Sequence, residues 1–385
     1  MTFQSLIIVR RNQDGAIKDV DMVRPSNFHA HLRAGDMMKT VAKDIMWWVK
    51  YLLVMPNTGP IDTVKKVKSY YAEICALRDS LGLKTEFIMT VYLTNKLTPV
   101  MVHTLADLPF KVEVKYYPPH KGATTGSGLG VPLDMVSNDT WKVMAERGMP
   151  LIGHFESVED KNGNVLPMEE REDYFMTHEF RPFRDNHPNL HINIEHASTA
   201  LAIARVKEDL TEKTTCGITP HHMILTLGDL KMRSWANHGR CMPIPKGPED
   251  MIACRKFATS GDARACLGDD TAPHPASAKE NIPFDEAACG CWLPHSLALY
   301  AYAFELEDAL DQRFVNFTAY NGANWRGLDF PNIDDRVVLV GDTVNDIPDP
   351  LHLPDGDRVV PLGWTTEPDR LKIGLAAVVE QQLKT

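Results

Sequence analysis

Two histidines separated by one residue stand near the start of the chain, in Phe28-His29-Ala30-His31-Leu32-Arg33. Side chains on an extended strand alternate between its two faces, so His29 and His31 project from the same side. Two adjacent imidazoles suit a metal ion, and Arg33 shares that side if the strand continues, where an anion beside the metal would bind. A lone His-x-His pair is more often incidental than functional, so this interpretation depends on further ligands elsewhere.

Two more histidines stand at the ends of apolar runs. His154 follows the run 150–153, and His196 ends the run 192–196. Either histidine alone is more often structural, but both occur downstream of the first pair, and together they favour a ligand role. The neighbouring Glu156 and Glu195 are expected to support the histidines or the fold rather than to bind metal.

Lys115 ends the apolar run that begins at residue 112. A lysine in this position is most often a surface residue whose stem packs on apolar neighbours. Beside metal cations, however, an ammonium is repelled and tends to lose its proton. The neutral amine can then add CO2 and form a carbamate, which is an anionic, bidentate ligand able to bridge two metals. The four histidines favour this interpretation of Lys115.

Asp270 completes the set, in the segment Leu267-Gly268-Asp269-Asp270-Thr271-Ala272-Pro273-His274. It can bind a metal and also handle a proton, although an N-cap or a surface acid is the simpler reading. Nitrogen and oxygen ligands without thiolates suit Zn²⁺ in a catalytic site with open positions. Two such ions roughly 3.5–4 Å apart would share a hydroxide that forms near neutral pH.

Short apolar runs separated by helical stretches must position these residues. Several runs are almost continuously apolar, which is typical of parallel strands covered on both faces. Eight such strands alternating with helices predict a (β/α)8 TIM barrel, with a doubly wound open sheet as the competing fold. The expected strands are 27–31, 51–55, 86–93, 111–117, 150–155, 191–196, 215–219 and 265–270, and the expected helices include 62–81 and 132–147.

The C-terminal ends of parallel barrel strands converge on one mouth, so the chemistry-bearing residues should meet there. We expect one barrel domain over residues 1–385, with residues 1–22 as an N-terminal strand extension. The first strand would precede the turn Asn12-Gln13-Asp14-Gly15. The segment 325–385, rich in Asp and Pro, is expected to pack outside the barrel.

Composition excludes several classes of function. The net charge is −10, and no basic run offsets it, so nucleic acid is not an expected partner. No apolar stretch is long enough to span a bilayer. The seven cysteines are scattered apart from Cys289-x-Cys291, which fits reduced thiols in the cytoplasm. Paired Cys-x2-4-Cys motifs are missing, so the sequence does not predict a thiolate zinc site.

Seven motifs, in order along most of the chain, carry a family resemblance. They are His29-Ala30-His31-Leu32-Arg33, Met55-Pro56-Asn57, Lys115-x-Tyr117-Pro118, Ala123-Thr124-Thr125, Glu195-His196, Ile218-Thr219-Pro220-x-His222 and Leu267-Gly268-x-Asp270-x-Ala272-Pro273-His274. From about Val23 to Asn324 the chain resembles the single-domain, bacterial-type dihydroorotases of the amidohydrolase superfamily. The combination is specific, although no single motif is.

The resemblance implies a binuclear zinc centre that interconverts N-carbamoyl-L-aspartate and L-dihydroorotate in pyrimidine biosynthesis. It implies two Zn²⁺ ions bridged by carboxylated Lys115 and a hydroxide. Its ligand sets are His29, His31 and Asp270 for the more buried ion, and His154 and His196 for the other. Asp270 would also move the proton of the reaction. We further expect a homodimer and a small-molecule substrate.

The resemblance also assigns substrate contacts. Arg33, Asn57 and His274 match positions that grip the substrate carboxylate, which agrees with the chemistry of a guanidinium beside an amide donor. Thr124 and Thr125 match the tip of a loop that closes over the site, and the flanking glycines give such a loop flexibility.

Main-chain groups near Met242 and Cys289 would contact the pyrimidine ring. This chain departs from the family at both, where leucine and alanine are usual, and at Asp269, where a small polar residue is common. If Asp270 points inward, strand alternation turns Asp269 away from the metals.

Two other functions stay open at this point. One is a different cyclic amidase that acts on hydantoins, dihydropyrimidines or allantoin, although those substrates lack the carboxylate that Arg33, Asn57 and His274 would grip. The other is a catalytically silent scaffold, which would be expected to lose ligands, whereas all six ligand positions are filled here.

Overall fold

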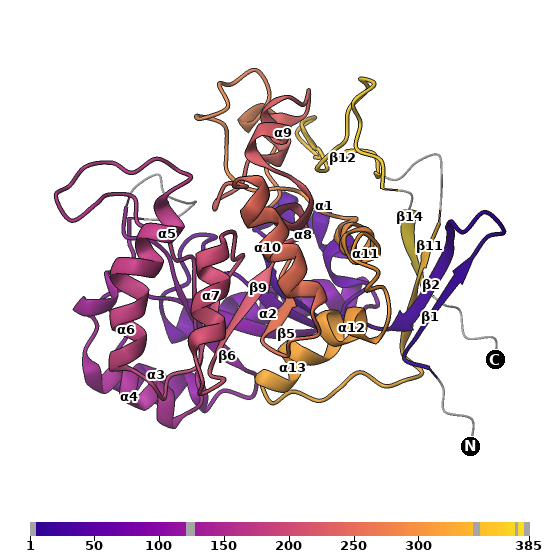
Figure 1. The fold of residues 1–385 in the computed structure, drawn as a ribbon. Helices are drawn as coiled ribbons and strands as arrows, with labels where there is room; N and C mark the ends of the chain where they lie inside the picture. Colours follow the sequence, from indigo (N-terminus) through magenta and orange to yellow (C-terminus); the bar gives the residue numbers. More distant parts are fainter. Residues whose placement is uncertain (1–4, 121–127, 342–346, 374–375, 381–385) are drawn as a thin grey trace.

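Eight short runs form one parallel sheet in the computed structural model, which describes residues 5–120, 128–341, 347–373 and 376–380 (Figure 1). Each strand pairs with its neighbours in sequence order, and nearly all strand residues are buried, because helices cover the outside and side chains fill the inside. The strands are β3 (Asn27–Ala30), β4 (Tyr51–Val54), β5 (Glu86–Tyr92), β6 (Val112–Tyr116), β7 (Leu151–Gly153), β8 (Ile192–Ile194), β9 (Thr214–Ile218) and β10 (Ala265–Leu267).

The sheet closes between β3 and the segment that follows β10. Ala30 forms an isolated parallel bridge with Thr271, and the His31 N–H donates to the Thr271 carbonyl at 2.9 Å. The Asp270 N–H donates to the His29 carbonyl at 3.1 Å. The prediction of a TIM barrel is therefore confirmed, and the competing open sheet is wrong.

Helices follow most of the strands and pack around them. Threonine N-caps begin several: Thr63, Thr98 and Thr199 each accept a hydrogen bond from a backbone N–H three residues on. The longer helices are α1 (Gly35–Met46), α2 (Val64–Ser80), α3 (Pro99–Ala106), α4 (Asn138–Glu146), α7 (Ala200–Glu208), α10 (Pro248–Thr259) and α11 (Ser296–Glu305). Among the helices that the structure describes, none has the length and apolar character needed to cross a membrane.

Short helical turns make up the connections. The short α-helices are α5 (Arg171–Phe175), α6 (Arg181–Asn186), α8 (Pro220–Ile224), α9 (Leu227–Lys231), α12 (Gln312–Val315) and α13 (Asn321–Trp325). The 3₁₀ turns are η1 (Leu133–Met135), η3 (Ala236–Gly239) and η4 (Ala276–Ala278), and the π-helical segments are η2 (Met176–Phe180) and η5 (Asn316–Tyr320).

The helix expected over 62–81 is present as α2, but the single helix expected over 132–147 is wrong. That stretch is split into the turn η1 and the helix α4. Ser137 stands between them with an extended backbone, and its hydroxyl accepts from the Thr140 N–H at 3.2 Å. A serine that caps a new helix interrupts the apolar periodicity that suggested a continuous one.

A second sheet joins the two ends of the chain beside the barrel (Figure 1). It contains β1 (Ile7–Arg11), β2 (Ile17–Val23), β11 (Arg336–Val340) and β14 (Ala376–Glu380), all antiparallel, and the predicted first strand is β1. Arg336 and Asp21 form a buried ion pair of 2.6 Å between β11 and β2. A small hairpin pairs β12 (Leu351–His352) with β13 (Arg358–Val359).

Polar side chains on β6 enter the barrel interior. Glu113, Lys115 and Tyr117 occupy alternate positions and so share one face of the strand. Glu113 is neutralised by the buried Arg326 of the segment after α13, with Nε and Oε1 2.8 Å apart. This pair occupies the side toward the N-terminal ends of the strands, so Lys115 lies one layer nearer the mouth.

Candidate active site and metal centre

A pocket lies at the C-terminal ends of the barrel strands. The space in it that admits a water-sized group is about 30 Å³, so the lining side chains nearly fill it. Its lining combines imidazoles, a guanidinium, an amide and a carboxylate. The lining residues are His29, His31, Arg33, Asn57, Tyr117, His154, His196, Met242, Asp270, Ala272, Cys289 and Gly290. A larger groove of about 1260 Å³ between α4 and α6 contains none of the predicted site residues.

The closing contact of the barrel brings the first histidine pair against Asp270. Asp270 Oδ1 lies 3.0 Å from His29 Nε2 and 3.1 Å from His31 Nε2. Both rings thus reach the same carboxylate oxygen, as the alternation of side chains along β3 predicts. Residues separated by some 240 positions in the chain meet because the first and last barrel strands are neighbours.

Three site residues have a backbone conformation that side chains rarely adopt. The φ angle is 64° at Arg33, 40° at His196 and 52° at Asp270. Left-handed conformations cost non-glycine residues of the order of 1–3 kcal/mol and collect at functional sites. Each of these residues lies two or three positions beyond the end of a strand, where the strained turn aims its side chain at the mouth.

Glu195 joins His29 to Lys115. Its Oε2 contacts His29 Nδ1 and lies 3.8 Å from Lys115 Nζ. Burial raises the pKa of Glu195, but His29 and Lys115 outweigh this and hold it below its ordinary value. A carboxylate on one ring nitrogen fixes the orientation of the histidine and leaves Nε2 for a metal.

Lys115 meets the physical conditions for a modified ligand. Its side chain is 0 % exposed, and Nζ has no hydrogen-bond partner within the described part of the chain. Burial lowers the pKa of Lys115 below its ordinary value, although Glu195 and Asp270 oppose the shift. Burial of an ammonium at this depth is costly even with Glu195 3.8 Å away, whereas an anionic ligand that faces metal cations is stabilised by them. The residues around Lys115 therefore fit a metal centre.

His154 and His196 lie next to the first cluster. The ring centroids of His154 and His196 are 4.7 Å apart, and those of His196 and His29 are 5.1 Å apart. Glu156 Oε2 lies 2.6 Å from His154 Nε2, which leaves Nδ1 of that ring for a metal. Lys246 Nζ lies 3.8 Å from the other oxygen of Glu156. The two glutamates thus support histidine rings, as predicted.

Asp270 remains ionised in this setting. Burial alone raises the pKa of Asp270, but contacts with His29 and His31 outweigh it and hold the pKa well below its usual range. Burial lowers the pKa of His31 to about 4, so this ring is neutral at pH 7. Neutral imidazoles and an ionised carboxylate are the protonation states that metal ligands require. His29, His196 and Asp270 also offer donor atoms that all lie within 4.8 Å of one another.

A basic group lies on the other side of the pocket. Arg33 Nε donates to the Pro273 carbonyl at 3.0 Å, and its Nη2 lies 2.9 Å from His274 Nε2. His274 Nε2 also lies 2.8 Å from the Cys289 carbonyl, but one nitrogen cannot accept from Arg33 and donate to Cys289 together. Burial and Arg33 lower the pKa of His274 to about 2, so the ring is neutral, and its tautomer decides whether Nε2 accepts from Arg33 or donates to the Cys289 carbonyl.

Asn57 faces the histidine pair from the end of β4. Its Oδ1 lies 2.8 Å from His31 Nδ1, so the amide oxygen orients that ring and leaves His31 Nε2 toward Asp270. Asn57 lines the pocket together with Arg33. Its amide therefore lies where it supports a ligand and borders the basic side of the site.

Curated relatives match most of the chain. A dihydroorotase of Halorhodospira halophila is 35% identical over 345 residues, which is 88% of this chain and 94% of the relative. A dihydroorotase of Picosynechococcus is 33% identical over 345 residues, covering 89% of this chain and 95% of the relative. The chain belongs to the dihydroorotase family.

Solved structures agree with this assignment to the dihydroorotases. The Saccharomyces cerevisiae dihydroorotase in complex with 5-fluoroorotic acid superposes with a TM-score of 0.81 at 26% identity and covers 94% of this chain and 99% of that one. An L-hydantoinase of Arthrobacter aurescens has a TM-score of 0.64 at 14% identity, covering 87% and 78%, and shares the fold. No family model matches the chain. The dihydroorotase family lies in the amidohydrolase superfamily.

The positions at which the chain departs from the dihydroorotase pattern fall in two places. Met242 and Cys289 line the pocket, where their main chains border the space for a ligand. Asp269 turns elsewhere: its Oδ1 accepts from the Thr271 N–H at 2.9 Å, and burial raises its pKa to about 6. Strand alternation predicted that Asp269 would be directed away from the pocket.

Three lining residues, Tyr117, Ala272 and Gly290, were not predicted as site residues, and two predicted residues lie outside the described part of the chain. Tyr117 lines the site, with Lys115 Nζ 5.1 Å from its ring centroid and its hydroxyl buried. Its position two residues after Lys115 on the same strand face was the available signal. Thr124 and Thr125 lie outside the described residues.

Proposed function

We propose that this chain catalyses the reversible cyclisation of N-carbamoyl-L-aspartate to L-dihydroorotate and water, a step of pyrimidine biosynthesis. The observation that carries the proposal is one pocket with two kinds of chemistry. Arg33 offers a charged donor for a carboxylate, while the histidines and Asp270 face the other end of the same space. Membership of the dihydroorotase family supports it.

We propose two Zn²⁺ ions in this pocket. His29, His31 and Asp270 would hold one ion, His154 and His196 the other, and carboxylated Lys115 would bridge them. The donor set supports the proposal, because it consists of imidazoles and carboxylates and lacks thiolates. When bound, the ions supply Lewis-acid polarisation of the ring carbonyl and a water that is ionised near neutral pH.

The chain's own residues would do the remaining work. Arg33 would bind the substrate carboxylate through paired hydrogen bonds and so orient the ring carbonyl toward Asp270. In ring opening, water oxygen bonds to the carbonyl carbon while Asp270 accepts a water proton. The bond between that carbon and the ring nitrogen then breaks, and Asp270 returns the proton to the nitrogen. Ring closure is the reverse sequence.

Carboxylation of Lys115 can be tested directly. We expect protein grown or equilibrated with ¹³C-labelled bicarbonate to give a carbamate resonance by NMR, and Lys115→Met to abolish it together with most bound metal. Lys111→Met, an exposed lysine four residues earlier, is the control. A labelled sample of active enzyme without a carbamate resonance would remove the bridge from the proposal.

The substrate proposal predicts a strong preference for a ring that carries a carboxylate. Arg33→Met should lower kcat/KM for L-dihydroorotate by about 10- to 100-fold, because a charge-assisted hydrogen bond contributes about 1.5–3 kcal/mol. Residual activity on dihydrouracil, which lacks the carboxylate, should not change. Lys39→Met, an exposed basic residue of α1, is the control. Equal activity of the wild type on both rings would favour a general cyclic amidase instead.

Three further features remain proposals. Thr124 and Thr125 would form the tip of a closing loop, so Thr125→Val should raise KM in steady-state assays.

A homodimer would sediment at about twice the 43.2 kDa of one chain, whereas a sedimentation mass of one chain would contradict it. All seven cysteines are free, which supports a reducing cytoplasm, and cell fractionation tests this location.

A further inference from the structure

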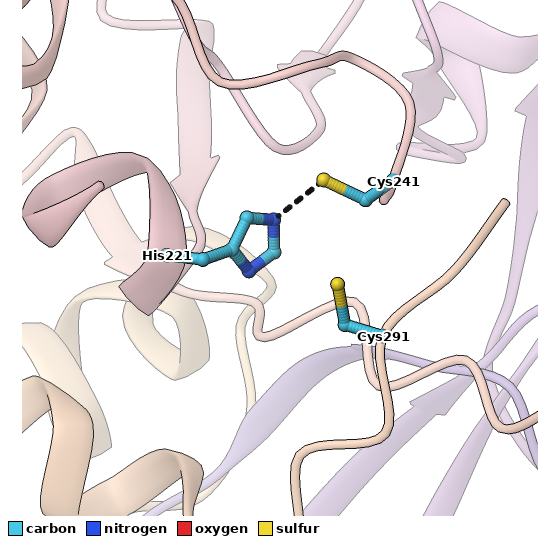
Figure 2. A group of neighbouring side chains, drawn as sticks. All are labelled: His221, Cys241 and Cys291. Carbon is cyan, nitrogen blue, oxygen red and sulfur yellow. Dashed lines mark hydrogen bonds between the residues drawn. The ribbon is translucent and has the colours of Figure 1, made fainter. Parts of the chain in front are cut away.

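A second group of metal-binding side chains lies near the substrate pocket. His221 belongs to α8, Cys241 follows η3, and Cys291 follows β10 in the segment that bridges to Thr271. The three residues are 1 %, 1 % and 0 % exposed. One donor atom from each lies within 4.8 Å of the others, and Cys241 Sγ is 3.2 Å from His221 Nε2. In Figure 2 both sulfur atoms face the His221 ring.

We propose that His221, Cys241 and Cys291 form a zinc site that is separate from the nitrogen and oxygen centre. Two thiolates and one imidazole leave a fourth position open, which is a set that Zn²⁺ accepts. With Zn–S near 2.3 Å and Zn–N near 2.0 Å, tetrahedral ligand atoms stand about 3.5–3.8 Å apart. The Cys241 Sγ–His221 Nε2 separation of 3.2 Å is slightly shorter than that value, and no two of the three donor atoms lie more than 4.8 Å apart, so small shifts would bring them to zinc-binding distances.

The ordinary alternative is three side chains packed in a core, and the hydrogen bonds of His221 argue against it. Nδ1 of this fully buried ring has no hydrogen-bond partner in the described part of the chain. Nε2 contacts Cys241 Sγ and, at 3.3 Å, the Thr219 hydroxyl. A buried polar nitrogen without a partner costs about 1–3 kcal/mol, and rotation of the ring edge toward a bound ion would remove that cost.

The charges around the site are compatible with a zinc ion that is bound by two thiolates. Lys279 is buried nearby, where its Nζ donates to the Asn237 carbonyl at 2.8 Å, and Arg240 Nη1 lies 2.5 Å from Cys289 Sγ. Two cations would repel a bare Zn²⁺. Binding releases both thiol protons, however, and two thiolates cancel the charge of the ion, so the occupied site is neutral.

The site joins two segments that border the substrate pocket. Cys241 precedes Met242, and Cys291 follows Cys289 by two residues; both neighbours line the pocket. The Gly290 N–H already donates to the Arg240 carbonyl at 2.9 Å. An ion here would hold both backbones in place. The existence of the site is independent of the proposed function, whereas an effect on KM for dihydroorotate rests on it.

Cobalt substitution tests the site by a signal that the other centre cannot give. Because the nitrogen and oxygen centre has no thiolate ligand, a thiolate-to-cobalt charge-transfer band in protein reconstituted with Co²⁺ arises only from Cys241 and Cys291. We expect this band in the wild type. Cys291→Ser should abolish it and remove one metal equivalent per chain. Cys254→Ser, a buried cysteine of α10 whose Sγ bonds the Ala197 carbonyl, should retain both.

Several outcomes would overturn the proposal. These are a wild type without the band, a band that survives Cys291→Ser, and a disulfide between Cys241 and Cys291 in the purified enzyme. If the serine variant does not fold, zinc-edge X-ray absorption on the wild type decides the question, since sulfur neighbours support the site and nitrogen and oxygen neighbours alone refute it. A wild-type protein that shows the band but has no dihydroorotase activity would refute the proposed function and would still support this site.

Discussion

The molecule carries two buried donor clusters that are built in different ways. His29 lies in β3, and His196 and Asp270 follow β8 and β10, so sheet pairing fixes where their backbones stand. His221, Cys241 and Cys291 come from a short helix and two connections outside the barrel ladder. The first cluster offers nitrogen and oxygen to water-activating chemistry. The second offers sulfur, which binds zinc firmly and suits a supporting role.

The difference indicates which part of a barrel is suited to hold reactive side chains. Strand ends hold donors to a fixed geometry, and Glu195 and Glu156 hold the histidine rings in turn. Connections are held by fewer backbone hydrogen bonds, so a metal that joins them supplies order that the sheet does not. Experiments that affect one cluster and not the other test whether the two clusters are independent.

The largest effect is expected from Asp270→Asn. Removing the proposed proton acceptor and ligand oxygen should lower kcat about 10³-fold or more in both directions, because general acid–base catalysis alone contributes 10²–10⁴-fold. Circular dichroism should show an intact fold, and the thiolate–cobalt band should persist. Near-normal turnover would exclude Asp270 from proton transfer. Asp269→Asn, whose carboxylate points elsewhere, is the matched control.

A smaller effect is expected from Glu195→Gln. The amide keeps the size of the side chain but loses the charge that contacts His29 and faces Lys115. Metal affinity at the nitrogen and oxygen centre should fall about 10- to 100-fold, as measured by competition with a chelator. The thiolate–cobalt band should keep its intensity. An equal loss of metal affinity at both clusters would show that they form one coupled site.

The smallest effect concerns His295, a buried histidine that belongs to neither cluster. Both ring nitrogens lack hydrogen-bond partners in the described part of the chain, and burial followed by Arg370 lowers its pKa to about 3. In the unfolded chain the ring titrates near 6.5, so below that pH only the unfolded state takes up the proton. The stability contribution of neutral His295 is therefore present above about pH 6.5 and is lost as pH falls.

His295→Gln should remove this part of the pH dependence. Between about pH 6 and pH 4.5 the unfolding free energy of the wild type should fall more steeply than that of the variant, by about 1.4 kcal/mol per pH unit at most. Urea titrations at matched metal content measure both slopes. His103→Gln, exposed on α3, should leave the slope unchanged. Parallel curves for wild type and His295→Gln would contradict the prediction.

The eight strands could be predicted because they are short β-rich runs, several of them almost continuously apolar, separated by helical stretches. Their C-terminal limits were less accurate: the runs 191–196 and 265–270 end as strands at Ile194 and Leu267. The reason is the left-handed backbone at His196 and Asp270, which turns the chain out of the sheet. These predicted site residues thus lie just beyond the strands, at turns that sequence periodicity does not report.

The nitrogen and oxygen cluster could be predicted because its members recur at strand ends and match one family pattern. The thiolate cluster could not, since single cysteines 50 residues apart on connections have no periodicity. The missing Cys-x2-4-Cys pairs argued against any such site. Only the fold brings Cys241 beside Cys291, because the segment after β10 bridges to the one that carries Cys291.

The barrel closes through an isolated bridge at Ala30 and Thr271 rather than through a continuous ladder. His29 and His31 stand on one side of this seam and Asp270 on the other. An ion bound by these residues would link the two edges of the barrel across this seam, so its binding free energy would also stabilise the barrel against unfolding. Zinc supply in the cell would then govern how long each molecule survives as well as whether it works.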